Sequence, residues 1–321
     1  MTSKTITPYP LNFCSTSVLA SALKYYDIDF FTDLFGSVWD LKLDIQYNEF
    51  LESFYKTLTI EPMAFNYPKS LDKYFNIKIC TLNIDYKNVL KTIKEYIDSG
   101  DIVICSMDPY YFAHYENYLN YHGLNWNHYV ILYGYDPIHN EIHYMDTTRG
   151  FIEGYYHKIS YQTFLESVFP KDNIYETVGE AYILNLDSYK AEKKEFFYNG
   201  IEKSNEICNY EVISILKNKL IQYKEISNLK FKEYQLDKLL KGIILVSQHR
   251  TGNLKYLEEN FPNSGYINEV KEIVELWSRM KFSISPSRKK NLEQKYHDII
   301  KYLDVLEQKE KVIFDASYKK Y

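Results

Sequence analysis

The spacing of apolar residues changes near residue 188, and this change limits the folds open to the chain. Before that point, strand-like runs at residues 102–105 and 129–135 alternate with helical patterns such as residues 15–26. After it, apolar residues recur almost wholly at helical spacing. The sequence therefore predicts an α+β fold in two parts, a mixed domain at residues 1–187 and a mostly helical C-terminal region at residues 188–321.

The same patterns predict the remaining elements. Strands are expected at residues 141–146 and 181–186, and helices at residues 49–58, 89–97, 212–223, 236–246, 267–280 and 292–306. Ser285 and Pro286 form a typical N-cap and first-turn pair for the last helix. His249 and Arg250 are expected at the end of an apolar helix, where cations suit the helix dipole.

Composition narrows the class of protein and its surroundings. The chain has 321 residues, of which 45% are apolar, so it can bury a large core, and its net charge of −5 argues against a general nucleic-acid binder. No segment is long and apolar enough to span a bilayer, and residues 1–11 lack the apolar stretch of a secretory signal. We expect a cytoplasmic protein without membrane contact. Exposed aromatic residues would permit a homodimer.

The four cysteines differ in their surroundings. They are irregularly spaced without a CxxC pair, so neither a metal site nor a disulfide framework is expected. Cys80 and Cys105 lie in strand-like runs and are expected to be small buried residues. Cys14 stands where an apolar helix begins, and a helix N-terminus favours the thiolate. The alternative for Cys14 is a buried, unreactive thiol.

His128 opens a strand and Asp146 closes the next one. The order Cys14, His128, Asp146 suits a nucleophile, a base and a group that orients the base. If the connecting loop has an odd number of residues, Asp146 lies opposite Val130 and shares a face with His128; an even loop places it on the other face. Each residue also has a structural alternative, His128 as a half-buried strand residue and Asp146 as a turn cap. Asp136, in the turn, is the second candidate for the orienting group.

A tyrosine-rich segment follows the strand at residues 102–105. Asp108 precedes Pro109, so it either shapes a turn or anchors the amine of a substrate in a cleft. Tyr111 belongs to the same segment and is a weak candidate for substrate contact.

Residues 9–185 resemble the acyltransferase family named for butirosin biosynthesis protein H, which is related to papain-like and C39-type cysteine peptidases. The matching features are Cys14 with residues 34–36, the run at residues 101–111, the tyrosines around Tyr115 and Tyr118, the strand at residues 128–136 and the stretch at residues 144–146. The resemblance implies a papain-like cysteine-protease core. It also implies an acyl group that passes from a carrier-protein thioester through acyl-Cys14 to a small-molecule amine, in specialised-metabolite biosynthesis such as that of nonribosomal peptides and antibiotics. The phosphopantetheine of an acyl or peptidyl carrier protein would hold the donor, and no metal or organic cofactor is implied.

One departure from the papain-like pattern concerns the oxyanion donor. Such peptidases usually have a Gln a few residues before the nucleophile, whereas residues 1–13 contain none, and Asn12 and Tyr9 are the weak candidates to replace it. One donor contributes roughly 3 kcal/mol, and an amide is harder to cleave than a thioester, so its absence disfavours a peptidase. A cysteine peptidase or amidase with water as acceptor, and a non-catalytic binding protein on this fold, are the two alternatives.

Overall fold

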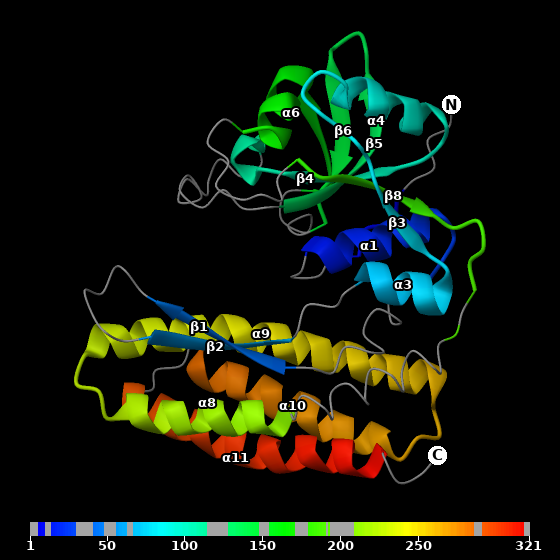
Figure 1. Ribbon diagram of the computed structural model, residues 1–321. Helices are drawn as coiled ribbons and strands as arrows, with labels where there is room; N and C mark the ends of the chain where they lie inside the picture. The colour runs from blue at the N-terminus through cyan, green and yellow to red at the C-terminus, as the bar shows by residue number, and fades with distance from the viewer. Residues whose placement is uncertain are drawn as a thin grey trace. The chain divides into compact units, whose positions relative to one another are not determined.

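A computed structural model describes residues 6–9, 14–29, 41–47, 56–62, 67–113, 128–147, 154–170, 179–190, 192, 209–285 and 291–317 (Figure 1). The chain divides into two compact units. The first combines residues 1–31 with 67–191, and the second combines residues 32–66 with 192–321. The expected division at residues 187 and 188 differs from this because residues 32–66, which come early in the chain, belong with the helical unit.

The first unit is built around an antiparallel sheet with the strand order β3-β8-β4-β5-β6-β7. The strands are β3 (Lys78–Thr81), β4 (Val103–Met107), β5 (His128–Asp136), β6 (Glu141–Met145), β7 (Tyr156–Ser160) and β8 (Ala181–Asn185). The helices are α1 (Cys14–Tyr25), α3 (Tyr67–Phe75), α4 (Val89–Asp98), α6 (Tyr161–Val168) and the 3-10 turn η2 (Pro109–Tyr111). This mixture confirms the predicted α+β class.

Both faces of this sheet are covered. Cys105, Val130, Tyr144 and Ala181 point to one face, where they share a core with residues of α4 and α6. Neighbours along each strand point the other way because side chains alternate. On that second face Ile104 and Ile131 are buried, and α1 packs against β5. Figure 1 shows α4 and α6 above the sheet and α1 below it.

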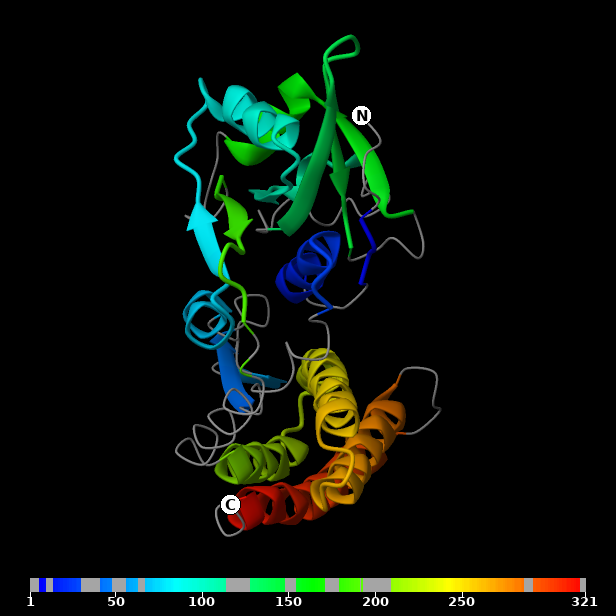
Figure 2. The ribbon, with the colours of Figure 1, turned by 90° about the vertical axis from the view of Figure 1, so that its right-hand side faces the viewer.

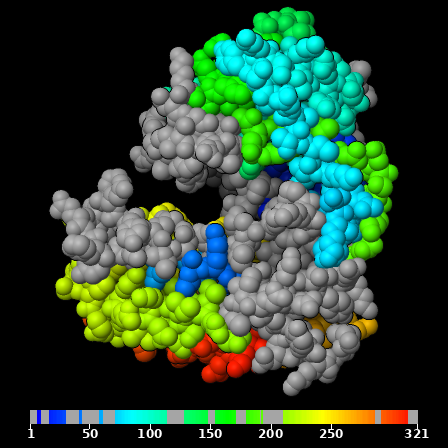
Figure 3. All heavy atoms as spheres, in the orientation of Figure 1, coloured from blue at the N-terminus to red at the C-terminus, as the bar shows by residue number. Residues whose placement is uncertain are grey.

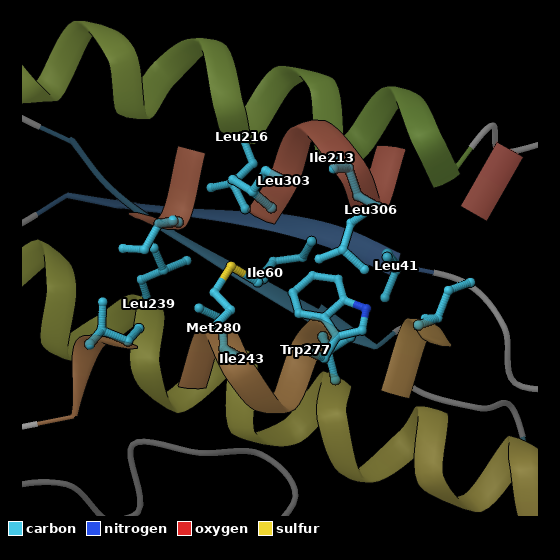
Figure 4. Close-up of a cluster of buried hydrophobic side chains, with 14 of the residues drawn as sticks. Leu41, Ile60, Ile213, Leu216, Leu239, Ile243, Trp277, Met280, Leu303 and Leu306 are labelled. Carbon is cyan, nitrogen blue, oxygen red and sulfur yellow. The ribbon is translucent and has the colours of Figure 1, made fainter. Parts of the chain in front are cut away.

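The second unit is a β-hairpin closed by helices around one core (Figures 2 and 4). Its elements are β1 (Leu41–Tyr47), β2 (Lys56–Pro62), α8 (Asn209–Lys224), α9 (Leu229–Asn260), α10 (Tyr266–Ile284) and α11 (Leu292–Ser317). The hairpin packs on α9 through β2, α9 packs on α10, α10 on α11, α11 on α8, and α8 on β1. The core that they enclose includes Leu41, Ile60, Leu239, Trp277 and Leu303.

The amide of Gln235 in α9 joins the hairpin to the helix. The buried side chain accepts a hydrogen bond from the Leu58 N–H at 2.8 Å and donates one to the Leu58 carbonyl at 2.6 Å. One side chain thus satisfies both the N–H and the carbonyl of Leu58. In an isolated hairpin, these two outward-facing groups would bond to water. This pairing explains why residues 32–66 fold with the helices.

Three local predictions were wrong. The helix expected at residues 49–58 gives way to strand β2 from Lys56 onward, because pairing with β1 outweighs the short helical pattern. Ser285 follows the end of α10, whereas Asn291 caps α11 by accepting from the Gln294 N–H at 2.8 Å. His249 and Arg250 lie inside α9 rather than at its end.

Arg250 has a structural role in the helical core. Its guanidinium is 1% exposed and forms two hydrogen bonds with Glu310 of α11, at 2.8 and 2.9 Å. Burial, with a smaller contribution from Arg250, lowers the pKa of His249 to about 3, so this imidazole is neutral. The sequence analysis placed both residues at a helix end because the local pattern does not show that α9 continues for another ten residues after Arg250.

The outer surfaces of α8 and α11 carry isolated apolar side chains. Figure 3 shows part of the surfaces of α8, in yellow-green, and α11, in red. Ile215 and Ile221 of α8 and Val305 and Val312 of α11 are exposed. Scattered residues of this kind are normal on protein surfaces.

Substitution of Gly242 tests the fit of α9 against β2. A methyl group at this position would lie 2.1 Å from the Ile60 carbonyl oxygen and 2.3 Å from Thr59 Oγ1. Because both atoms belong to a packed strand, we expect Gly242→Ala to lower the free energy of unfolding by about 1–3 kcal/mol in urea titrations followed by circular dichroism. Gly265→Ala, at the N-cap of α10, is the control because its added methyl would have no neighbour within 4 Å, and it should lower the stability less than Gly242→Ala. Equal stability of the two variants would contradict this packing.

The thiol of Cys105 should be unreactive in the folded protein. It is fully buried in the sheet, and burial raises its pKa to about 12. At pH 8 only about one molecule in ten thousand would carry the thiolate. We therefore expect iodoacetamide to modify Cys105 at least about a hundredfold more slowly in the native protein than in urea, measured by peptide mapping. Similar rates in the two states would show that this strand opens readily.

Candidate functional site

A buried histidine–aspartate pair lies at one end of the six-stranded sheet. His128 Nε2 and Asp146 Oδ1 are 3.1 Å apart, and their side chains are 10% and 1% exposed. His128 is the first residue of β5, and Asp146 follows directly after β6. The sequence analysis predicted this pairing, and the structure brings the two side chains together.

The pair depends on the register of β5 and β6. Asp136 pairs with Glu141, so the turn has four residues, and the odd loop that the predicted pairing required does not form. A bulge at Tyr133 shifts the register by one residue, so Leu132 pairs with Tyr144 and Ile131 with Met145. Continued by one step, this register sets Asp146 opposite Val130, on the side of His128. An even turn and one extra residue thus have the effect of an odd loop.

A sequence signal for this bulge exists beside it. Gly134 interrupts the strand, and an isolated Gly in a strand often marks a bulge. A Cβ at this position would lie 3.3 Å from His143 Nδ1 across the pair, so the absence of a side chain allows the close approach.

Aromatic residues surround the imidazole. The Phe112 ring meets the His128 ring edge-on, with ring centroids 5.9 Å apart. The centroids of the Phe112 and Tyr144 rings are 5.2 Å apart. Burial, followed by the nearby Asp146 carboxylate, raises the pKa of Tyr144 far above its usual value, so this phenol stays neutral. The sequence analysis did not identify Phe112, because nothing in its local pattern separates it from other core residues.

Helix α1 is anchored at its C-terminal end to the beginning of β4. The Tyr25 hydroxyl donates to the Gly100 carbonyl at 2.9 Å, and the Tyr26 hydroxyl donates to Asp101 Oδ1 at 3.2 Å. From there β4 runs to Met107, which pairs with His128. The first turn of α1 is thereby directed toward the His128 end of the strands. Figures 1 and 2 agree, since α1 lies beside the ends of β5 and β6 that are remote from their connecting turn.

Cys14 is the first residue of α1, as predicted, while its side chain lies outside the described part of the structure. The helix begins without an acidic residue in its first turn, so the positive end of its dipole faces no competing carboxylate from this segment. The backbone therefore offers a thiolate at Cys14 the stabilisation that a helix N-terminus supplies.

The Tyr9 carbonyl accepts a short hydrogen bond from Ser17 near the start of α1, but the Tyr9 phenol is directed away from Cys14. The Tyr9 N–H donates to Ser21 Oγ at 3.0 Å, and burial and the interaction of the phenol with Asp29 raise its pKa. Lys24, at the other end of the helix, also acts on this phenol. Ten residues of helix separate Cys14 from Lys24, about 15 Å. Tyr9 is thus a poor oxyanion donor, and Asn12 lies outside the described residues.

Asp108 shapes the turn after β4. Its carboxylate accepts a hydrogen bond from the Tyr110 N–H at 3.0 Å and caps η2, and its own N–H donates to the Ser167 carbonyl. Asp108 is 4% exposed, and burial raises the pKa of its carboxyl group. The expected alternative of a substrate anchor is therefore disfavoured. Tyr111, within η2, is half-buried against the ring of Tyr110.

Asp136 belongs to the hairpin turn at the far end of β5. Its carboxylate accepts from the Ile138 and His139 N–H groups at 2.8 and 3.1 Å, and His139 Nδ1 lies 2.6 Å away. These contacts leave it remote from His128. Asp146, rather than Asp136, is the carboxylate that lies beside the imidazole.

Two further classes of site were sought in the described ranges. No group of three or more His, Cys, Asp or Glu side chains there is placed to hold a metal ion. Among the helices of the same ranges, none combines the length and apolarity needed to cross a membrane.

Comparison with known proteins covers the unit that holds this pair. No curated protein shows significant similarity to the chain. The model of the Peptidase_C39 like family matches residues 2–182, more than half of the sequence, and this range includes Cys14, His128 and Asp146. The chain therefore belongs to the Peptidase_C39 like family, and its first unit has that family's papain-like cysteine-enzyme fold.

Proposed function

We propose that the chain is a cysteine acyltransferase that moves an acyl group from a carrier-protein thioester to a small-molecule amine and forms an amide. Cys14 acts as nucleophile, His128 as base and Asp146 as the group that orients the base. The observation that carries the proposal is the buried contact between His128 Nε2 and Asp146. It lies at the end of the sheet to which the first turn of α1 is directed.

The pair assigns roles to the two imidazole nitrogens. With Nε2 held by the Asp146 carboxylate, Nδ1 is the nitrogen that takes the thiol proton of Cys14. The carboxylate fixes the ring and stabilises the imidazolium that results. Both residues are buried, so their attraction is screened less than that of a surface pair.

The reaction proceeds in two halves. In the first, the Cys14 thiolate attacks the carbonyl of the thioester, the bond to the carrier sulfur breaks, and His128 returns its proton to the departing thiolate. In the second, an uncharged amine attacks acyl-Cys14, and His128 takes a proton from the amine while the bond to the Cys14 sulfur breaks. The products are an amide and the free thiol, and the cycle needs no oxidant, metal or organic cofactor.

Two features favour a thioester over a peptide as the acyl donor. The segment before Cys14 contains no Gln, and the Tyr9 phenol is directed toward the far end of α1, so neither of these groups serves as an oxyanion donor beside Cys14. A thioester is the easier bond to cleave and tolerates a weaker oxyanion site. Its chemistry also suits a carrier protein, whose phosphopantetheine arm presents such a thioester in the cytoplasm.

The covalent intermediate can be tested by intact-mass measurement. The protein is mixed with a carrier whose phosphopantetheine bears a hexanoyl group. We expect the wild type to gain one hexanoyl group and Cys14→Ala to gain none, because Cys14 is the proposed nucleophile. Cys80→Ala, which removes a partly exposed thiol, is the matched control and should still be acylated. An adduct on Cys14→Ala would refute the assignment. Addition of an amine separates transfer from hydrolysis, since a peptidase-like enzyme would release hexanoic acid alone.

The role of Asp146 can be separated from general effects on the hairpin. We expect Asp146→Asn to lower the rate of amide formation by about 10³–10⁴-fold, because the neutral amide neither fixes the productive tautomer nor stabilises the imidazolium. Asp136→Asn makes the same change at the other end of the hairpin and should lower the rate by less than about threefold. Equal losses in both variants, with unchanged circular dichroism, would contradict an orienting role.

A further inference from the structure

The Phe112 ring lies on the core side of His128. Val130 points into the core formed with α4 and α6, and side-chain alternation along β5 puts His128 on the same face. Met107, which pairs with His128, and Phe112 belong to that core as well. Phe112 is 1% exposed, and its ring meets the imidazole at 70° with centroids 5.9 Å apart. The imidazole therefore has two neighbours that can fix it, Asp146 at Nε2 and the Phe112 ring.

The turn before Phe112 holds the ring in place. Phe112 directly follows η2, and its N–H donates to the Pro109 carbonyl at 3.1 Å. The Asp108 carboxylate caps the same turn, while the Asp108 N–H donates to the Ser167 carbonyl of α6 at 2.8 Å. Proline also restricts the backbone of η2, because its ring fixes φ. Phe112 thus leaves a short turn that is tied to α6, and its backbone has little freedom to move away from the imidazole.

A second ring packs against Phe112. The centroids of the Phe112 and Tyr144 rings lie 5.2 Å apart at an angle of 37°, and Tyr144 is also 1% exposed. Tyr144 comes two residues before Asp146, so strand alternation puts both side chains on one face, and the Asp146 charge acts on the Tyr144 phenol. Phe112 and Tyr144 together occupy the core side of the pair that His128 forms with Asp146.

The contact with Asp146 does not by itself fix the imidazole plane. The carboxylate lies at a single ring atom, Nε2, and the ring can still turn about that contact through its two side-chain torsions. Nδ1 must point at the Cys14 sulfur to take its proton, so the direction of the ring plane affects the rate. An aromatic neighbour that meets the imidazole edge-on restricts this rotation, because such pairs have a preferred geometry.

We infer that Phe112 is a positioning residue for His128, an inference that rests on the proposed function. Phe112 holds the imidazole plane so that Nδ1 is directed to Cys14 while Nε2 stays at Asp146. It also excludes water from the core side of the pair, where attraction between charges is then screened less. Phe112 acts through the base rather than on the substrate.

Turnover separates this role from general packing. With the hexanoyl carrier as donor and 3-methoxypropylamine as acceptor, Phe112→Leu should lower kcat about 10–100-fold and leave the KM for the carrier unchanged, because a misdirected base slows the chemical step. Phe164→Leu makes the same change at a fully buried ring of α6 in the same core and is the matched control. It should lower kcat less than about threefold. Equal losses in the two variants would overturn the inference.

Alkylation of Cys14 reports on the base without a substrate. A free thiol has a pKa of about 8.5, so at pH 6 Cys14 reacts rapidly with iodoacetamide only where a neighbouring positive charge stabilises its thiolate. We expect Phe112→Leu to slow this modification about tenfold at pH 6 and to leave the rate at pH 9.5 unchanged, measured by peptide mapping. Phe164→Leu should match the wild type at both pH values. An unchanged rate at pH 6 in Phe112→Leu would overturn the inference.

A second substitution covers the case in which Phe112→Leu does not fold. Phe112→Met keeps most of the side-chain volume without the ring, and it should show the same losses in both measurements. Slower alkylation at pH 6 in the Phe112 variants, together with no amide from the wild type, would retain the positioning role and refute the acyl transfer. Amide formation at the wild-type kcat in these variants would overturn the inference and leave acyl transfer standing.

Discussion

The register between β5 and β6 is the constraint on which the candidate site depends. Asp146 shares a face with His128 only if the turn and the bulge between them contain, in total, an odd number of unpaired residues. A four-residue turn fails this condition, and the bulge at Tyr133 restores it. The turn itself is fixed by the Asp136 carboxylate, which accepts from two backbone N–H groups, and by Asn140, whose φ is +55°. A change in either the turn or the bulge would separate the imidazole from its carboxylate.

The helical unit depends on a comparable local fit. Helix α9 approaches β2 closely because Gly242 has no side chain at the Ile60 carbonyl, and the amide of Gln235 binds the backbone of Leu58 on both sides. The buried pair of Arg250 and Glu310 then ties α9 to α11. Such a pair adds little net stability compared with an apolar one, but breaking it would leave a buried charge and cost about 3–5 kcal/mol. Polar contacts therefore decide which surfaces of this unit meet.

Acidic side chains near His128 have three different tasks. Asp146 contacts the imidazole, Asp108 caps a turn, and Glu180 accepts from a tyrosine hydroxyl on the opposite face of the sheet. Their residue type alone does not distinguish them. What differs is the set of hydrogen-bond donors that the fold brings to each carboxylate, and this set decides the role of each acid.

The sequence alone determined the α+β class, the helix that begins at Cys14, the strands at His128 and Glu141, and the helices of the second unit, because each has a clear local period or boundary signal. It also suggested the pairing of His128 with Asp146, on the condition of an odd loop, whereas the structure meets the same requirement with an even turn and a bulge. Only the tertiary structure decided that residues 32–66 join the helices, that Arg250 is buried, that the Tyr9 phenol is directed away from Cys14 and that Glu180 meets Tyr182. These features rest on contacts between residues distant in the chain, or on a one-residue shift in pairing, and neither leaves a period that a local pattern can show.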